Sequence, residues 1–387
     1  MHRIFKMKVV WVLACVFTGS TAVSPFDVIS IGERLTLKST ILGEERPYMV
    51  SLPQGYDGVS KLPVLYVLDA EEHFSIFATS IDYLGRHTNI PPMMVVGVPS
   101  TGSRENNMVP YISDWSPKGG GADKFLAFFR DELIPEIDRK YTTSDFNVIA
   151  GKSYGGLFAL YALTQQESPF KAYIAASPSV FLKDNQIVKD LWESRATVAK
   201  AKFIFASHAN EDDIMRKPYD EVTGILNHVM KRANSIGHRF YMEERHETVF
   251  LPTLMDAMEL MFKTFQSPRY VRRLGAAGVV GHYQAIINDM ELGIEIPERV
   301  FSYIGNLTRD KDTMPQALEI FREGVKRYPN SEKAKYYLIR TLLKVGNKEE
   351  ARTHLEDAVI KAGRQDAASE YLNWFKETLT QLEIVQE

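Results

Sequence analysis

The segment Gly151-Lys152-Ser153-Tyr154-Gly155 has the residue types and the spacing of a serine nucleophile. It matches the pattern Gly-x-Ser-x-Gly, in which a sharp turn between a strand and a helix presents a serine hydroxyl at the edge of a sheet. An apolar run ends at Ala150 just before it, and helical spacing begins at Tyr154. We predict that Ser153 is a nucleophile and that the backbone N–H of Tyr154, at the start of a helix, is one donor of an oxyanion hole. A glycine-rich turn in an ordinary strand–helix unit is the alternative.

A serine nucleophile requires a base, and position in the chain narrows the choice among the histidines. In sheets with such a serine the chain order is Ser, acid, His, with the histidine on the loop after the last strand. Six histidines come before Ser153, lie in the C-terminal tail or fall inside a helical pattern: His2, His73, His87, His228, His282 and His354. His208 comes before the loop carboxylates that are expected to supply the acid, and His238 precedes the strand expected at 239–244. His246 follows that strand, so we predict that it is the general base; a solvated loop histidine is the alternative.

The acid that orients this histidine is expected on the loop after the strand at 202–207. Three carboxylates compete there, in the run His208-Ala209-Asn210-Glu211-Asp212-Asp213. Only a side chain that points inward can fix the histidine tautomer and stabilise the imidazolium. We choose Glu211, and Asp212 and Asp213 remain open.

The elements that must position these residues alternate along the chain up to about residue 281. Apolar, β-branched and aromatic runs predict strands at 34–39, 47–52, 63–68, 93–98, 146–150, 172–177, 202–207 and 239–244. Helical spacing predicts helices at 123–140, 154–166, 219–235 and 252–265. Runs that are apolar at nearly every position, such as 64–68, are typical of strands buried on both faces. We therefore predict an α/β fold with a mostly parallel central sheet flanked by helices.

The C-terminal tail differs in composition and contains a repeat. Most of the 24 glycines and 18 prolines lie at or before Gly281, so the tail is expected to be helical. A shift of 34 residues, the tetratricopeptide (TPR) period, aligns Ala317, Phe321, Gly324 and Val325 with Ala351, Leu355, Ala358 and Val359. Helices are predicted at 331–345 and 349–362. One such repeat is not stable alone, so the tail is expected to pack on the catalytic domain or on a protein partner; an ordinary helical bundle is the alternative.

The N-terminus has the composition of an export signal. A basic start, an apolar run at 9–17 and the small residues at 20–22 indicate cleavage after Ala22 and an exported protein, periplasmic or secreted. Lipid attachment at Cys15 fits less well, because the preceding apolar run is short and Leu13 is unsuitable; a buried first segment is the alternative. No later run reaches the roughly 20 apolar residues of a membrane span. The predicted organisation is a signal at 1–22, a hydrolase domain at 23–268, a helical linker at 269–297 and a TPR-like domain at 298–387.

Composition removes several classes of function. The 387 residues are 45% apolar, enough for two domains with a core. Lys and Arg total 46 against 49 Asp and Glu, so the net charge of −3 gives no general attraction to nucleic acid. Cys15 is the single cysteine, which excludes disulfides, cysteine-based metal sites and a thiol nucleophile from the rest of the chain.

The segment 34–265 resembles the esterase D and enterochelin-esterase group of α/β-hydrolases. The resemblance rests on Leu68-Asp69-Ala70-Glu71-Glu72-His73-Phe74, on Val96-Gly97-Val98 followed by Arg104 and Pro110, on the serine turn, on Ala176-Ser177-Pro178-Ser179 and on His246. It implies an α/β-hydrolase fold, favours Glu211 as the acid, and places the second oxyanion donor near Ala70. Ala70 stands where the family usually has glycine, and Lys152 where it has His or Gln, which bears on the preferred substrate.

These residues together predict ester hydrolysis through an acyl-enzyme, with a small-molecule ester as substrate and with neither metal nor organic cofactor. The resemblance allows siderophore esters, feruloyl or acetyl esters, thioesters and acyl transfer to sugars. His73, Tyr111, Trp115 and the loop 119–121 lie on segments that could border the substrate. The alternative function is a catalytically weak scaffold or binding protein whose TPR-like tail recruits a peptide or a protein partner, and a peptidase is a third.

Overall fold

The computed structural model describes residues 29–87, 90–102, 104–232, 234–266, 269–362 and 371–384. The expected export signal, its cleavage point at Ala22 and Cys15 lie outside these residues. From Ile31 onward the chain forms one compact unit.

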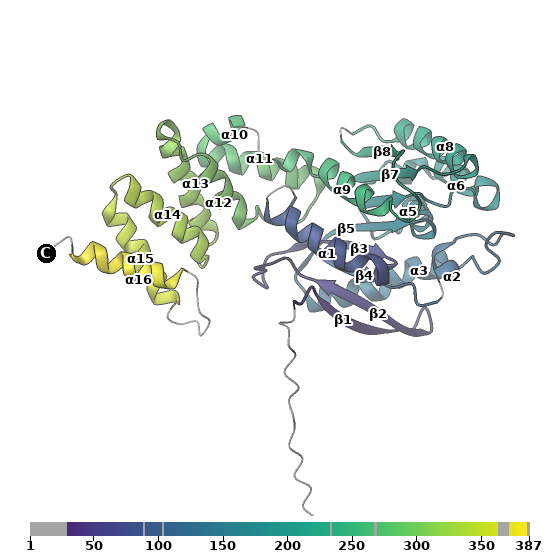
Figure 1. Ribbon diagram of the computed structural model, residues 1–387, viewed down its shortest axis with the longest axis horizontal. Coiled ribbons are helices and arrows are strands. Elements are labelled where there is room, and N and C mark those ends of the chain that lie inside the picture. Colours follow the sequence, from purple (N-terminus) through teal and green to yellow (C-terminus); the bar gives the residue numbers. More distant parts are fainter. Residues whose placement is uncertain are drawn as a thin grey trace, which may run out of the picture. The chain divides into compact units, whose positions relative to one another are not determined.

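An eight-stranded sheet, with helices beside it, forms the N-terminal part of this unit (Figure 1). Its strands are β1 (Glu33–Ser39), β2 (Glu44–Ser51), β3 (Leu62–Leu68), β4 (Met94–Val98), β5 (Thr143–Lys152), β6 (Ala172–Ala176), β7 (Phe203–Ala209) and β8 (Ile236–Tyr241), in the spatial order β1-β2-β4-β3-β5-β6-β7-β8. The first two strands are antiparallel to their neighbours, and all the others are parallel. The predicted α/β fold with a mostly parallel sheet is therefore confirmed.

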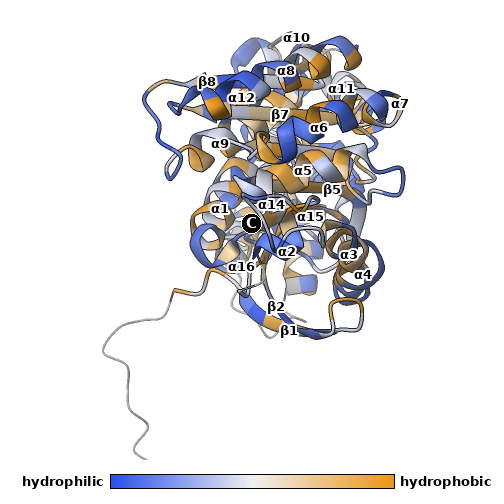
Figure 2. Cartoon of the chain, turned by 90° about the vertical axis from the view of Figure 1, so that its right-hand side faces the viewer, coloured by the Kyte–Doolittle hydropathy of each residue, from blue (hydrophilic) through white to orange (hydrophobic). Residues whose placement is uncertain are grey.

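Helices cover both faces of the sheet because its central strands are apolar on both sides. Within β3, Val64 and Tyr66 point into one buried cluster, and Leu65 and Val67 point into the other. The first cluster includes residues of α3 (Ala122–Phe128), the π-helical turn η1 (Phe129–Leu133), α4 (Ile134–Lys140), α5 (Tyr154–Thr164), α6 (Leu182–Glu193), α7 (Arg195–Val198) and α8 (Asp213–Val229). The second includes residues of α1 (Ala70–Arg86), α9 (Phe250–Met261) and the 3-10 turn η2 (Lys263–Phe265). Figure 2 shows apolar residues concentrated on α5 and on the neighbouring β5.

Several elements differ from the sequence predictions. The helix expected at 123–140 is divided by η1, and the helix expected at 219–235 begins earlier, at Asp213, with Pro218 inside it, and ends at Val229. The helices α1, α6 and α7 were not predicted. The last strand begins at Ile236, not at residue 239, so His238 lies inside β8 and not before it. This edge strand has only one buried residue, Tyr241, which leaves little apolar pattern to mark its start.

The tail consists of helices, as predicted. After α10 (Arg269–Arg273) and α11 (Gly275–Met290) come α12 (Glu298–Leu307), the short turn η3 (Lys311–Thr313), α13 (Met314–Arg327), α14 (Glu332–Lys344), α15 (Lys348–Ala362) and α16 (Leu372–Ile384). Of the eight residues that the 34-residue shift aligns, five are buried in one cluster: Ala317, Phe321, Ala351, Leu355 and Ala358. Residues of α11, α12 and α13 share the second sheet cluster, so this part of the tail packs on the α/β body. Its TPR-like identity and the domain borders remain predictions.

Within the described part of the chain, we find no helix that combines the length and the apolar character of a membrane-crossing segment.

Candidate active site

Ser153 occupies a strained turn between β5 and α5. The strand ends at Lys152, the helix begins at Tyr154, and Ser153 between them has φ 60° and ψ −117°. A positive φ is uncommon for a residue with a side chain and persists where the surrounding structure imposes it. A Cβ at Gly151 would lie 2.4 Å from the carbonyl carbon and oxygen of Gly155, so the chain can close this tightly only with glycine there. Such backbone strain is concentrated at functional sites.

The hydroxyl of Ser153 faces a second serine. Ser153 Oγ lies 3.2 Å from Ser179 Oγ, within hydrogen-bonding distance, and the N–H of Ser179 donates to the carbonyl of Ser153 at 3.2 Å. The structure forms no hydrogen bond between the described side chains of Ser153 and His246. Bonds between a nucleophile and its base are often long in ligand-free proteins and tighten in the substrate complex.

His246 and Glu211 are brought together from two different loops. His246 lies between β8 and α9, Glu211 follows β7, and the Nδ1 of His246 hydrogen-bonds with Oε1 of Glu211. The other two carboxylates of the β7 loop are placed differently: Asp212 is the N-cap of α8, and the side chain of Asp213 is 76% exposed and 3.3 Å from Lys217 Nζ. Of the three carboxylates, Glu211 is therefore the one paired with His246.

The electrostatic surroundings keep Glu211 ionised. Burial acts to raise the pKa of Glu211, but the hydrogen bond and the charge of His246, together with the charge of His208 and a hydrogen bond from Ser177, outweigh it. The pKa of Glu211 consequently lies below its ordinary value. An ionised carboxylate at Nδ1 is the partner that a catalytic imidazole needs in order to accept a proton at Nε2.

His208 lies beside Glu211 and is not among the predicted site residues. Its Nε2 lies 3.4 Å from Oε2 of Glu211, and its side chain is 1% exposed. Its position three residues before Glu211, at the end of a buried strand, was the available signal. The orientation of the ring depends on packing against Tyr219 and Phe240, which are far from it in the chain.

The two expected oxyanion donors are the first residues of two helices. Ala70 begins α1 after β3, and Tyr154 begins α5 after β5, and these two strands are neighbours. The first N–H groups of a helix have no acceptor within it, and they attract negative charge. A Cβ at Gly155 would lie 3.4 Å from Leu68 and 3.5 Å from Oδ2 of Asp69, so the start of α5 packs directly against the turn that leads into α1. The fold thus places both helix starts at one edge of the sheet.

A partly buried ion pair between Arg104 and Asp69 lies at this edge. Arg104 binds both carboxylate oxygens of Asp69, with Nε–Oδ1 at 2.8 Å and Nη2–Oδ2 at 2.9 Å, and its Nη2 also donates to the carbonyl of Lys152 at 3.2 Å. Its guanidinium lies 5.1 Å from the ring centre of Tyr154. One side chain therefore connects the turn before α1 with the turn that carries Ser153. Bidentate pairs of this kind fix geometry as well as charge.

The segments expected to border the substrate have different surroundings. Trp115 is 68% exposed and packs edge-on against Phe181, whereas Tyr111 is buried and its hydroxyl donates to Asp190. His73 packs between Phe77 and Phe250, and burial lowers the pKa of His73. Trp115 is the one of these three that presents a large aromatic surface to solvent.

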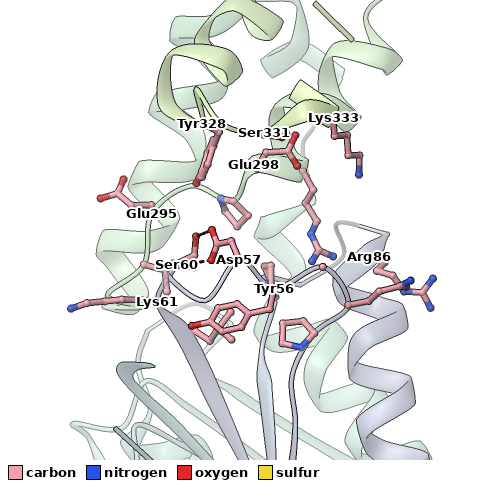
Figure 3. Close-up of a pocket in the computed structure, with 18 of the residues that line it drawn as sticks. Tyr56, Asp57, Ser60, Lys61, Arg86, Glu295, Glu298, Tyr328, Ser331 and Lys333 are labelled. Carbon is pink, nitrogen blue, oxygen red and sulfur yellow. Dashed lines mark hydrogen bonds between the residues drawn. The ribbon is translucent and has the colours of Figure 1, made fainter. Parts of the chain in front are cut away.

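A cavity of about 610 Å³ lies away from these residues (Figure 3). Its walls are the loop that enters β3, the end of α1, and the starts of α12 and α14; Tyr56, Arg86, Glu298 and Tyr328 are among the side chains lining it. The cavity is lined by Leu62, at the amino end of β3. Ala70 and Ser153, in contrast, follow the carboxyl ends of β3 and β5. Ligands of parallel sheets bind outside the carboxyl ends of the strands, so this cavity is not the candidate active site.

Comparison with known proteins identifies siderophore esterases among the relatives of this chain. The ferri-bacillibactin esterase BesA of Bacillus subtilis is 31% identical over 169 residues, which cover 38% of this chain and 58% of that protein. The siderophore enterobactin esterase of Emericella nidulans is 31% identical over 37% of this chain and 54% of its own length. The chain therefore spans less than two thirds of the length of these relatives.

A solved structure shows the same fold over most of the chain. The IroE-like serine hydrolase from Shewanella oneidensis has a TM-score of 0.67 and 24% sequence identity, covering 77% of this chain and 99% of that one. Residues 39–227, which contain Ser153 and Glu211 and end before His246, match the family described as putative esterase.

Proposed function

We propose that this protein is a serine hydrolase that cleaves carboxylic esters through a covalent acyl-enzyme. The observation that carries the proposal is the strained backbone of Ser153 between β5 and α5, at the sheet edge where the paired Glu211 and His246 also lie. A sharp strand-to-helix turn with glycine two residues to either side is the setting in which serine acts as a nucleophile. The match of residues 39–227 to putative esterases supports the same chemistry.

In the proposed reaction, Ser153 Oγ attacks the ester carbonyl while His246 Nε2 takes its proton. The tetrahedral intermediate then collapses, the alcohol leaves with the proton from His246, and the acyl group stays on Ser153. Water attacks the acyl-enzyme in the same way and releases the acid. This sequence requires the Ser153 hydroxyl to turn from Ser179 to His246 when substrate binds.

Glu211 is assigned as the residue that orients the imidazole, and the N–H groups of Tyr154 and Ala70 as the oxyanion donors. Glu211 accepts from Nδ1 of His246, which leaves Nε2 free to receive the serine proton. The Arg104–Asp69 pair supports the donors, because it connects the two turns from which they start. Removal of a single oxyanion donor in enzymes of this type costs about 100-fold to 1000-fold in kcat.

The substrate class that we propose is an aromatic or siderophore ester. The names of the relatives, a ferri-bacillibactin esterase and a siderophore enterobactin esterase, support it. The exposed indole of Trp115 adds an aromatic surface on which a planar acyl group could stack. Export across a membrane is proposed from the sequence of residues 1–22 alone, and the TPR-like character of the tail from the 34-residue period.

The test is hydrolysis of p-nitrophenyl acetate and butyrate by the mature protein, with Ser153→Ala and His246→Ala in parallel and His238→Gln as a matched histidine control. We expect both site variants to lose at least about 1000-fold in kcat with folding retained, whereas His238→Gln, at an exposed position on β8, retains activity. Labelling of the wild type by a fluorophosphonate, and not of Ser153→Ala, identifies the nucleophile. Equal activity in all variants, or no activity and no labelling of the wild type, rejects the esterase assignment. A peptide substrate assayed beside the esters separates an esterase from a peptidase.

A further inference from the structure

Arg299 is a partly buried cation without a counter-ion among the described residues. It is the second residue of α12 and lines the cavity of about 610 Å³ beside the start of β3. Its Nη1 is buried without a hydrogen-bond partner, and its guanidinium forms no hydrogen bond or ion pair with the part of the chain that the structure describes. A Cβ built on Gly85 would lie 3.5 Å from this Nη1, so the nitrogen rests against the backbone of α1 where glycine leaves room for it.

The surroundings of Arg299 leave its charge uncompensated. Taking a guanidinium out of water without a paired anion is unfavourable. Burial lowers the pKa of Arg299, and the weaker attraction of Asp82 and Glu298 does not offset it. Both carboxylates are engaged elsewhere: Asp82 accepts from Nε of Arg86 at 2.8 Å, and Glu298 accepts at 2.6 Å from a serine hydroxyl one turn later in α12.

The other carboxylates that line the cavity do not pair with Arg299 either. Asp57 accepts three hydrogen bonds within its own loop, at 2.6 to 2.9 Å. The side chain of Glu295 is 82% exposed, and Glu332 is in contact with another group. Three further cations line the same cavity: Lys61, Arg86 and Lys333. The charge that this wall lacks is therefore a negative one, next to Arg299.

The uncharged part of the wall suits a flat apolar group. Tyr56 lies on the β3 side of the cavity and Tyr328 on the side of the tail (Figure 3). Their hydroxyls donate to backbone carbonyls, so the polar end of each ring is already satisfied. Pro92 and Pro297 add apolar surface. A volume of about 610 Å³ is within the range of small-molecule sites, which combine apolar and aromatic walls with a few polar groups.

We propose that this cavity is a second binding site, separate from the candidate active site, for a small organic anion that carries a carboxylate on an aromatic body. The carboxylate lies beside Arg299 and supplies the missing counter-charge, and the aromatic body lies between Tyr56 and Tyr328. Because its walls come from the loop before β3, the end of α1 and the starts of α12 and α14, the ligand contacts both the α/β body and the tail. The inference does not depend on the proposed esterase activity.

Isothermal titration calorimetry of the full chain with benzoate tests the proposal. Benzoate has the proposed charge and ring, benzamide has the ring without the charge, and acetate and inorganic phosphate have a charge without the ring. We expect benzoate to bind to one site in this cavity at least about 10-fold more tightly than each of the other three. Ser153→Ala and His246→Ala should bind benzoate as the wild type does, because neither residue lines the cavity.

Arg299→Met separates the charge from the packing, since methionine keeps an unbranched apolar stem. We expect the affinity for benzoate to fall at least about 10-fold and kcat for p-nitrophenyl acetate to stay unchanged. In a zwitterionic buffer without added ligand, this variant should unfold at a higher urea concentration than the wild type, because a partly buried cation without a partner has been removed. Arg139→Met, at a side chain that is 68% exposed and outside the cavity, is the matched control and should change none of these quantities.

Tyr56→Leu is a second variant that keeps the test decisive if Arg299→Met does not fold. It should weaken the binding of benzoate and leave the binding of acetate unchanged. Equal affinity for benzoate in the wild type and in either variant overturns the proposal, as does benzamide or phosphate binding as tightly as benzoate. Benzoate binding that is lost in His246→Ala and retained in Arg299→Met would place the ligand at the candidate active site and also overturns it. A wild type that binds benzoate in this way but hydrolyses no ester rejects the esterase assignment and leaves the second site established.

Discussion

Replacing Glu211 by glutamine is the substitution that most directly tests the site. The side chain of Glu211 is 11% exposed, and each of its oxygens faces an imidazole nitrogen, His246 Nδ1 on one side and His208 Nε2 on the other. Glutamine has the same shape but carries an NH₂ group in place of one oxygen. The amide can be oriented in two ways. The NH₂ group then faces either Nδ1 of His246 or Nε2 of His208, and each of these nitrogens faces a carboxylate oxygen in the native protein.

The expected loss can be worked out from these contacts. With the NH₂ group against His246, Nδ1 must accept, so the proton moves to Nε2 and the imidazole can no longer take a proton from Ser153. The wrong tautomer in a serine triad costs on the order of 10⁴-fold in kcat. With the NH₂ group against His208, the tautomer is retained but the negative charge that stabilises the imidazolium is lost. We expect a fall in kcat of about 10³-fold to 10⁴-fold, which corresponds to about 4 to 5.5 kcal/mol of transition-state stabilisation.

The assay is kcat and KM for p-nitrophenyl butyrate at neutral pH, with folding followed by circular dichroism. Asp213→Asn is the matched control, because Asp213 is exposed and pairs only with Lys217 at the surface, a contact worth little. It should change kcat by less than about 2-fold. A folded Glu211→Gln protein within 10-fold of the wild type, or a larger loss in an asparagine variant of Asp212 or Asp213, would refute the assignment of the acid.

Three further predictions concern stability. Gly151→Ala should lower the free energy of unfolding by about 1 to 3 kcal/mol in urea titrations, because its Cβ would meet the backbone of Gly155 at 2.4 Å; an unchanged transition would contradict the close approach. Arg104→Met should cost about 1 to 3 kcal/mol, since Asp69 is 6% exposed and loses both hydrogen bonds; a change within about 0.5 kcal/mol would mean that the carboxylate is solvated. The lowered pKa of Glu211 means that its carboxylate stabilises the fold above the ordinary value of 4.5, and that this contribution disappears as the pH falls through the lowered pKa. The stability difference between the wild type and Glu211→Gln should therefore shrink below pH 4.5, and a constant difference across that range would contradict the pKa direction.

The features that the sequence predicts well are those set by neighbours in the chain. The turn at Ser153 is specified within a few residues, because an apolar strand, glycines at 151 and 155 and an apolar helix follow one another directly. Strands such as β3 are recognisable because they are apolar at every position and buried on both faces. The helices α14 and α15 were predicted from the 34-residue repeat and from the few glycines and prolines in the tail. In each case the physical cause, backbone conformation or a buried face, is contained in a short stretch of chain.

The boundaries that the sequence places wrongly are those where this local pattern is weak. The edge strand β8 has a single buried residue, Tyr241, so no apolar pattern marks its start at Ile236. The helix predicted across 123–140 is continuous in its spacing, but the π-helical turn at 129–133 interrupts it. Phe129 and Leu133 of that turn are fully buried in the core beneath the sheet.

The sequence by itself determined that the chain carries a serine turn on an α/β sheet, followed by carboxylates and a histidine in the order that ester hydrolysis uses. Only the tertiary structure decided which carboxylate lies beside His246, because Glu211, Asp212 and Asp213 differ in direction and not in type. It also decided that His208 faces the same carboxylate. These contacts join the ends of β7 and β8, and their distances depend on how two strands and the helices beside them pack, which no single stretch of sequence contains.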